Sequence, residues 1–280
     1  MSSQITTAFV QQYSSNVQLL SQQKGSLLRN AVRVESQVGK NAFYDQVGSA
    51  TAQKRLSRHA DTPQIDTPHA RRRESLVDYE YADLIDDQDK VRTLIDPTSP
   101  YSQATAFAMG RAIDDEIVSA AFGTAYTGET GSTSTTFPAG LSIAKLVEAK
   151  QLLDESNVDP TLPRYCAVAP EQLADLLNIT TVTSSDYNTV KALVQGEIDT
   201  FLGFKFIVST RLSSETGTNR RVIAWAEDGL LLSIGKDITA KIDERADKGY
   251  ATQVYYCMSI GATRMEEEKV VEITVVMFNK

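Results

Sequence analysis

Residues 61–73 read DTPQIDTPHARRR, a turn-rich segment that ends in three consecutive arginines. The aromatic pair at 43–44 precedes this segment, and apolar residues alternate with acidic ones over 77–81 after it. Alternation with a period of two is typical of a half-exposed β-strand. We therefore predict a long two-stranded arm that contains these two runs and has residues 61–68 as its tip. An isolated hairpin is marginal in water, so such an arm needs something to hold it.

Charge is distributed unevenly around this arm, in a chain whose formal net charge is −8. Residues 1–60 carry seven basic and two acidic side chains, whereas residues 74–96 carry eight acidic and two basic ones. These segments are either solvated surface or surfaces that meet another copy or nucleic acid. For the arginine triplet we favour contact with the acidic segment of another copy over contact with DNA phosphates. The candidate inter-subunit residues are Arg71, Arg72, Arg73, Tyr79, Tyr81, Asp83, Asp86, Asp87 and Asp89; the weaker DNA-facing candidates are Lys24, Arg29 and Arg33.

The N-terminal segment, residues 3–20, is polar but has apolar residues at helical spacing. This pattern predicts one short amphipathic helix that ends near Gly25. A helix with so thin an apolar stripe is marginal alone, so we expect neighbouring chains to hold it. The candidate arm contacts are Ile5, Phe9, Tyr13 and Val17.

The patterned core begins near residue 97, so we expect a chain starting near Asp96 to fold by itself but not to assemble. Two turn signals mark this part of the chain: Pro170 suits the first position of a helix, and Asp228-Gly229 suits a hairpin. The fold class is α+β. We predict helices over about 100–122, 142–153, 170–177 and 185–194, and strands over 164–169, 204–208, 221–226, 230–234, 254–260 and 271–277.

Motifs for catalysis are missing from the sequence. It contains no G-x-S-x-G and no G-x-G-x-x-G motif, and its two histidines, His59 and His69, fall in the polar arm, where we expect exposed loop residues. The acidic run at 266–268 is expected to be a solvated turn. Cys166 and Cys257 lie in apolar stretches and are expected to be buried thiols. We therefore predict no enzyme activity, no cofactor, no metal site and no membrane span.

The order of these parts resembles the tailed-bacteriophage major capsid fold of the Hong Kong 97 type, over essentially the whole chain. The most family-like stretch is GEIDTFLGFKFIVSTRL at 196–212, and the segment 61–73 is similar to extended-loop sequences of relatives. The resemblance implies the following parts: an N-terminal arm, 1–30; an extended-loop hairpin, 31–85; a peripheral domain, 86–138 and 239–280, with a long spine helix at about 100–122; and an axial domain, 139–238.

The implied function is that of a structural major capsid protein. Such a protein self-assembles through pentamers and hexamers into an icosahedral phage head that encloses double-stranded DNA. Its expected location is the virion capsid, assembled in the host cytoplasm, and its expected partners are other copies, a portal, non-specifically packaged DNA and a separate scaffolding protein. The scaffolding protein is expected because Met1 leads almost directly into the arm. An encapsulin-like shell around a cargo enzyme and an oligomeric enzyme remain as alternatives.

Some relatives join an extended-loop lysine to an asparagine of the neighbouring subunit. The matching residue types here are Lys40, Lys54 and Asn279. Because nothing in their spacing shows that they meet, we expect them to be ordinary surface residues.

Overall fold

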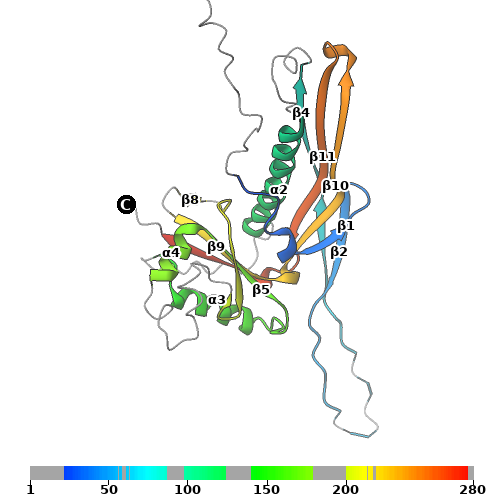
Figure 1. Ribbon diagram of the computed structural model, residues 1–280. Helices are drawn as coiled ribbons and strands as arrows, with labels where there is room; N and C mark the ends of the chain where they lie inside the picture. The colour runs from blue at the N-terminus through cyan, green and yellow to red at the C-terminus, as the bar shows by residue number, and fades with distance from the viewer. Residues whose placement is uncertain are drawn as a thin grey trace, which may run out of the picture. The chain divides into compact units, whose positions relative to one another are not determined.

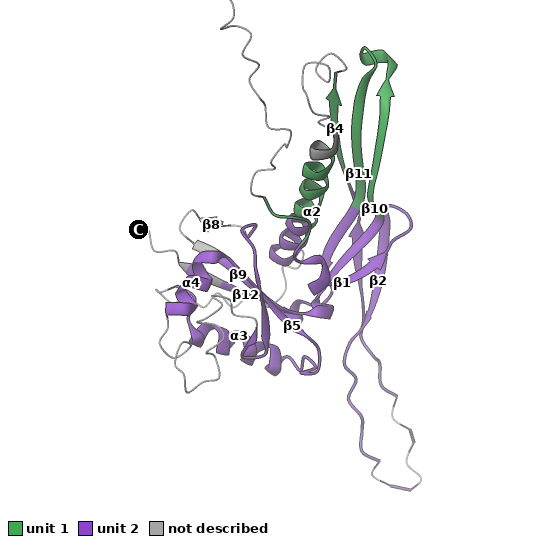
Figure 2. Ribbon diagram, in the orientation of Figure 1, with its two compact units in different colours: residues 1–26, 78–113, 236–259 green, residues 27–77, 114–235, 260–280 purple. Residues whose placement is uncertain are grey.

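A computed structural model describes residues 22–55, 57–58, 61–62, 64–86, 98–123, 140–178, 200–212, 214–216 and 219–276. The predicted helices at 3–20 and 185–194 lie outside these residues. The chain forms two compact units, shown in Figure 2. Unit 1 comprises 1–26, 78–113 and 236–259; unit 2 comprises 27–77, 114–235 and 260–280. No helix among the described residues is long and apolar enough to cross a membrane.

Unit 1 is built on three adjacent strands and the first part of a long helix (Figure 1). The strands are β4 (Val77–Ile85), β10 (Leu230–Arg245) and β11 (Ala251–Arg264), and the helix is α2 (Thr98–Phe122), close to the predicted 100–122. The hydroxyl groups of Ser102 on α2 and Tyr256 on β11 lie 2.5 Å apart. A 3-10 turn, η4 (Ala246–Lys248), joins β10 to β11.

Unit 2 contains a six-stranded sheet in the order β12-β9-β5-β7-β6, with β8 paired to β9. β5 and β7 are parallel, whereas the pairs β12–β9, β5–β9, β6–β7 and β8–β9 are antiparallel. The strands are β5 (Arg164–Val168), β6 (Thr200–Phe201), β7 (Phe204–Val208), β8 (Ser214–Thr216), β9 (Asn219–Ala226) and β12 (Val270–Val276), and the helices are α3 (Ile143–Glu155) and α4 (Pro170–Asn178).

The core of unit 2 lies between this sheet and its two helices. Leu146 and Leu153 of α3, Leu176 of α4 and Phe204 of β7 are fully buried in one apolar cluster. The backbone N–H of Lys145 donates to the Ser142 hydroxyl oxygen over 3.5 Å, as expected for a helix N-cap. The predicted helices that begin near Ser142 and at Pro170 are therefore confirmed.

The segment after residue 26 is part of the core, which corrects the expectation that the compact body begins near residue 97. Leu28, Ala31 and Val32 are at most 4 % exposed. The 3-10 turn η2 (Arg29–Ala31) leads into β1 (Arg33–Ser36), which pairs in parallel with β10 and completes a four-stranded sheet in the order β1-β10-β11-β4. A chain starting near Asp96 would lose two strands of this sheet and would expose the core.

Two predicted strand pairings are wrong. β2 (Asn41–Val47) pairs with β3 (His69–Ser75) and not with the run at 77–81, which belongs to β4 beside β11. Asp228-Gly229 does not close a hairpin, because η3 (Glu227–Gly229) connects β9 and β10, which belong to different sheets. Local turn signals show where the chain bends, but long-range pairing decides which strands become neighbours.

Candidate inter-subunit surface

The β2–β3 hairpin has two faces of different character. Side chains alternate along each strand, and the register places Phe43 opposite Arg73 and Asp45 opposite Arg71 on one face. Tyr44 lies opposite Arg72 on the other face. The first face is exposed and is called the outer face here. It comprises Asn41, Phe43, Asp45, Val47, His69, Arg71 and Arg73.

The inner face is attached to the rest of unit 2. The Tyr44 hydroxyl lies 3.0 Å from the Ser233 hydroxyl. Arg72 donates to Glu267 over 3.0 Å, and the two side chains are only 14 % and 15 % exposed. Arg264 approaches the other oxygen of Glu267 at 2.8 Å, so this carboxylate lies between two arginines. Glu267 is thus a paired anchor, which corrects its expected place in a solvated turn.

The outer face keeps a charged and partly apolar surface in contact with solvent. Arg71 Nε donates to Asp45 Oδ1 over 2.5 Å, and its guanidinium lies 5.9 Å from the centre of the Phe43 ring. The hydrogen bond to Asp45 raises the pKa of Arg71, so this side chain stays charged. Phe43 and Val47 are 59 % and 65 % exposed. Since burial of such side chains is favourable, this face is suited to contact with another protein surface.

Beyond the paired strands the hairpin continues as a long loop. Its base is closed where Gly48 N–H donates to the Pro68 carbonyl over 2.8 Å. Nearly every described side chain between these two residues is exposed, Thr67 being half-buried. Figure 1 shows this loop reaching away from the strands of the hairpin. Described residues of unit 2 therefore leave it uncovered.

The base of the hairpin crosses β10 and β11 at two glycines. A side chain at Gly235 would collide with Leu76, and one at Gly261 would collide with the Glu74 carboxyl and approach the Ser75 carbonyl oxygen to 2.8 Å. Glu74 is only 6 % exposed. Burial, followed by the charge of Glu116 on α2, raises the pKa of Glu74 to about 7. The sequence shows Glu74 only as one acid of an acidic run, so this buried site could not be found there.

Unit 1 carries acidic residues on β4. Tyr255 donates to Glu80 over 2.9 Å, and Ser259 donates to Asp78. The bond to Glu80 raises the pKa of Tyr255 to about 12, so its phenol stays protonated and keeps donating. Because these two carboxylates have neutral partners, β4 keeps negative charge available to a basic partner. Neither Asp78 nor Glu80 was among the residues singled out from the sequence.

The other predicted contact residues are placed only in part. Tyr79 and Asp83 on β4 are half-buried, and Tyr81 and Asp86 are exposed. Lys24 is exposed, Arg29 is half-buried, and Arg33 forms an ion pair with Glu35 of its own strand. Residues outside the described part of the chain are Asp87, Asp89, Ile5, Phe9, Tyr13, Val17, His59 and Asn279.

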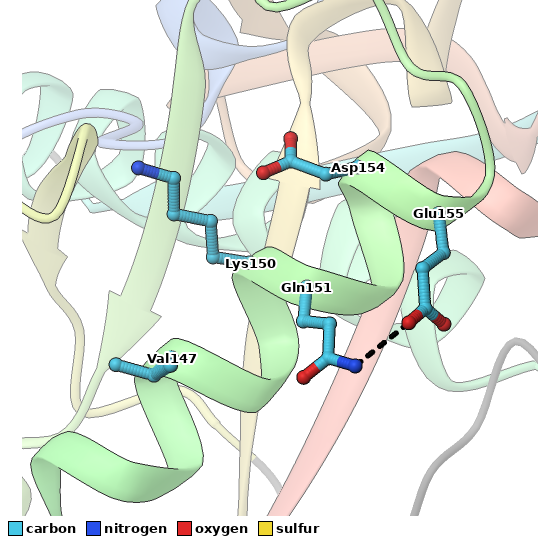
Figure 3. A pocket seen from close by; sticks show the side chains of 5 residues that line it. All are labelled: Val147, Lys150, Gln151, Asp154 and Glu155. Atoms are coloured by element: carbon cyan, nitrogen blue, oxygen red, sulfur yellow. Dashed lines mark hydrogen bonds between the residues drawn. The ribbon is translucent and has the colours of Figure 1, made fainter.

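The structure offers little to support chemistry. Figure 3 shows a shallow pocket on α3, where Gln151 donates to Glu155 over 2.7 Å. Asp154, which also lines this pocket, is paired with Arg164 at 2.7 Å. Within the described residues, no three His, Cys, Asp or Glu side chains lie close enough together to hold a metal ion. Cys166 and Cys257 are buried and free, as expected.

Comparison with known proteins identifies the chain at the family level. The profile of the family described as phage capsid protein matches residues 5–277, so the chain belongs to that family. Its class is therefore that of a structural, non-enzymatic protein. A comparison with curated proteins gives no match.

Solved capsid structures share its fold. The capsid structure of cyanophage P-SCSP1u superposes with a TM-score of 0.75 at 18% identity, covering 99% of this chain and 95% of that one. Mycobacterium phage Che8 gives 0.71 at 18% identity, with 95% and 97% covered. The capsid of Ralstonia phage GP4 gives 0.73 at 11% identity, with 97% and 96% covered.

Proposed function

We propose that this phage capsid protein is the major capsid protein of a tailed phage, with the Hong Kong 97-type arrangement of parts. In this proposal, copies assemble through pentamers and hexamers into an icosahedral head that encloses double-stranded DNA. The β2–β3 hairpin and its loop form the extended loop, α2 is the spine helix, and the six-stranded sheet belongs to the axial domain. A portal and a separate scaffolding protein complete the proposed set of partners.

The observation that carries this proposal is the contrast between the two faces of the hairpin. The inner face is fixed to unit 2 by Tyr44 and Arg72, whereas the outer face and the loop beyond Gly48 are exposed. A two-stranded ribbon exposed in this way gains stability when a second surface covers it. Closed symmetry repeats the same contact around every ring of subunits, so a modest contact is multiplied.

We further propose that the hairpin of one copy lies on the acidic surface of the next copy. Of the three arginines, Arg71 and Arg73 are exposed and are therefore the two available for this contact. The proposed receiving residues are the predicted Asp83 and Asp86, together with Asp78 and Glu80 on β4. Arginine can grip a carboxylate through two hydrogen bonds, which also fixes the orientation of the contact.

The test replaces residues 49–67 with a short Gly-Ser linker, which is flexible enough to connect Gly48 to Pro68 without strain. Because the described residues of the loop make no contact that holds the sheets together, the variant should remain folded and keep its melting temperature. Negative-stain microscopy should then show small oligomers where the parent chain forms closed shells. As a matched control, replacing exposed Lys54 and Arg55 with serine keeps the loop and should keep the shells. Closed shells from the loop-deleted chain would refute the proposed role.

A further inference from the structure

The base of the hairpin packs closely against strands β10 and β11. Glu74, Ser75 and Leu76 cross β10 and β11 at Gly235 and Gly261, and all five residues belong to unit 2. The Glu74 carboxyl fills the space that a side chain at Gly261 would need. A group enclosed in this way cannot turn towards water without moving the strand that carries it. Any change in the charge of Glu74 therefore acts on the attachment of β3.

Opposing influences act on the Glu74 carboxyl. Burial and the nearby Glu116 on α2 disfavour its charged form, whereas the Ser75 backbone N–H and the Thr263 hydroxyl on β11 donate hydrogen bonds that favour it. The balance raises its pKa from 4.5 to about 7. The neighbouring charges on Arg72, Arg264 and Glu267 are already paired with one another.

The contacts that Tyr44 and Arg72 make on the inner face do not place a charge beside a like charge. The pair formed by Tyr44 and Ser233 involves two neutral hydroxyls, and Arg72 and Glu267 carry opposite charges. Neither contact buries a charge without a partner. Glu74 is thus the inner-face group whose ionisation opposes attachment.

We propose that protonation of Glu74 controls how firmly the hairpin base is attached to the β10–β11 crossing, which makes the hairpin a pH-dependent arm. The relevance of this device to shell assembly rests on the function proposed above, but the device itself is a property of the single subunit. In acid the neutral carboxyl stays in place and the hairpin is firmly attached. At higher pH the buried charge favours release of β3.

The direction of the pH dependence follows from the linkage between proton binding and attachment of the hairpin. The attached state binds the proton more tightly than the released state, so attachment is strongest below pH 4.5 and weakens as the pH rises to about 7. If the released carboxyl recovers its ordinary pKa, the equilibrium constant for release rises about 40-fold between pH 5 and pH 7. It changes little above pH 8, where both states are ionised.

Amide hydrogen exchange of the full-length, unassembled subunit tests this, followed between pH 5 and pH 8 and corrected for the intrinsic exchange rate. Peptides covering 41–47 and 69–75 should lose protection as the pH rises in the parent chain. Glu74→Gln, which stays neutral, should keep its acid-level protection throughout. Glu244→Gln, at an exposed position on β10, is the matched control and should follow the parent chain.

A second variant keeps the proposal testable if Glu74→Gln does not fold. Glu116→Gln removes the like charge and should move the transition to lower pH. If Glu74→Gln folds and retains the pH dependence of the parent chain, the proposal is overturned. If Glu74→Gln does not fold, an unshifted transition in Glu116→Gln overturns it instead. Since no shell is needed for these measurements, their failure is distinct from a failure to assemble.

Discussion

Trp225 donates its indole N–H to the carbonyl oxygen of Ala31 over 2.8 Å, and both residues are about 1 % exposed. This bond joins the segment before β1 to strand β9 of the six-stranded sheet. It is a contact between residues almost two hundred positions apart, formed in a part of the chain whose sequence is mostly polar. The N-terminal segment after residue 26 therefore contributes to the stability of the folded subunit.

Trp225→Phe should lower the free energy of unfolding by about 1–3 kcal/mol, because the Ala31 carbonyl loses its buried donor. Urea unfolding followed by circular dichroism measures the change. The control is Tyr165→Phe, which removes a hydroxyl and keeps the ring that stacks on Trp225 at 5.9 Å. A Trp225→Phe variant as stable as the control would show that the bond contributes nothing.

Arg72→Glu should destabilise the subunit, in contrast to the same change at exposed Arg73. It would place a second carboxylate beside Glu267 and remove a largely buried ion pair, at a cost of about 3 kcal/mol. Arg73→Glu should leave the thermal midpoint unchanged and should impair assembly. Replacing all three arginines together would therefore mix an effect on stability with an effect on assembly. Equal melting temperatures for the two single variants would contradict this assignment.

Asp114 and Asp115, adjacent on α2, should respond differently to replacement by asparagine. Asp114 is fully buried and accepts hydrogen bonds from the backbone N–H groups of Leu27 and Leu28, at 3.0 Å and 3.1 Å. Asp114→Asn loses charge-assisted bonds and should cost about 1–3 kcal/mol. Asp115→Asn breaks an exposed pair with Arg211 and should cost about 0–1 kcal/mol. Thermal unfolding of the two variants decides the order.

Cys166 should resist alkylation until the subunit unfolds. Burial raises the pKa of its thiol to about 12, and the thiolate is the reactive form. Cys257 is 8 % exposed, so iodoacetamide at pH 8 should label it first. Peptide mass spectrometry over a urea series gives both rates. Labelling of Cys166 at the native rate of Cys257 would mean that the core around β5 opens locally.

Periodicity predicted the elements that lie inside continuous apolar patterns. The helix over about 100–122, the helices near Ser142 and from Pro170, and the strands at 164–169 and 204–208 are all present. Their patterns are set by burial against neighbours, so each can be recognised without knowing which neighbours they are.

The sequence analysis was wrong where a residue far along the chain determines whether a segment is buried or exposed. The polar segment 27–37 is ordered by Trp225 and Asp114, which no local pattern reveals. Arg71 and Arg72 look alike in sequence, and only the register of β3 separates the exposed one from the one bound to Glu267. For the same reason the compact body was wrongly expected to begin near residue 97.

The backbone bond between Gly48 and Pro68 makes the length of the loop beyond it independent of the folded body. Doubling the length of a flexible loop costs only about 0.6 kcal/mol in closure entropy. Foreign peptides inserted near residue 55 should therefore be accommodated by the subunit without loss of stability. The space between assembled copies would then limit the length of the insertion. The longest insertion that still allows assembly would therefore report the size of that space.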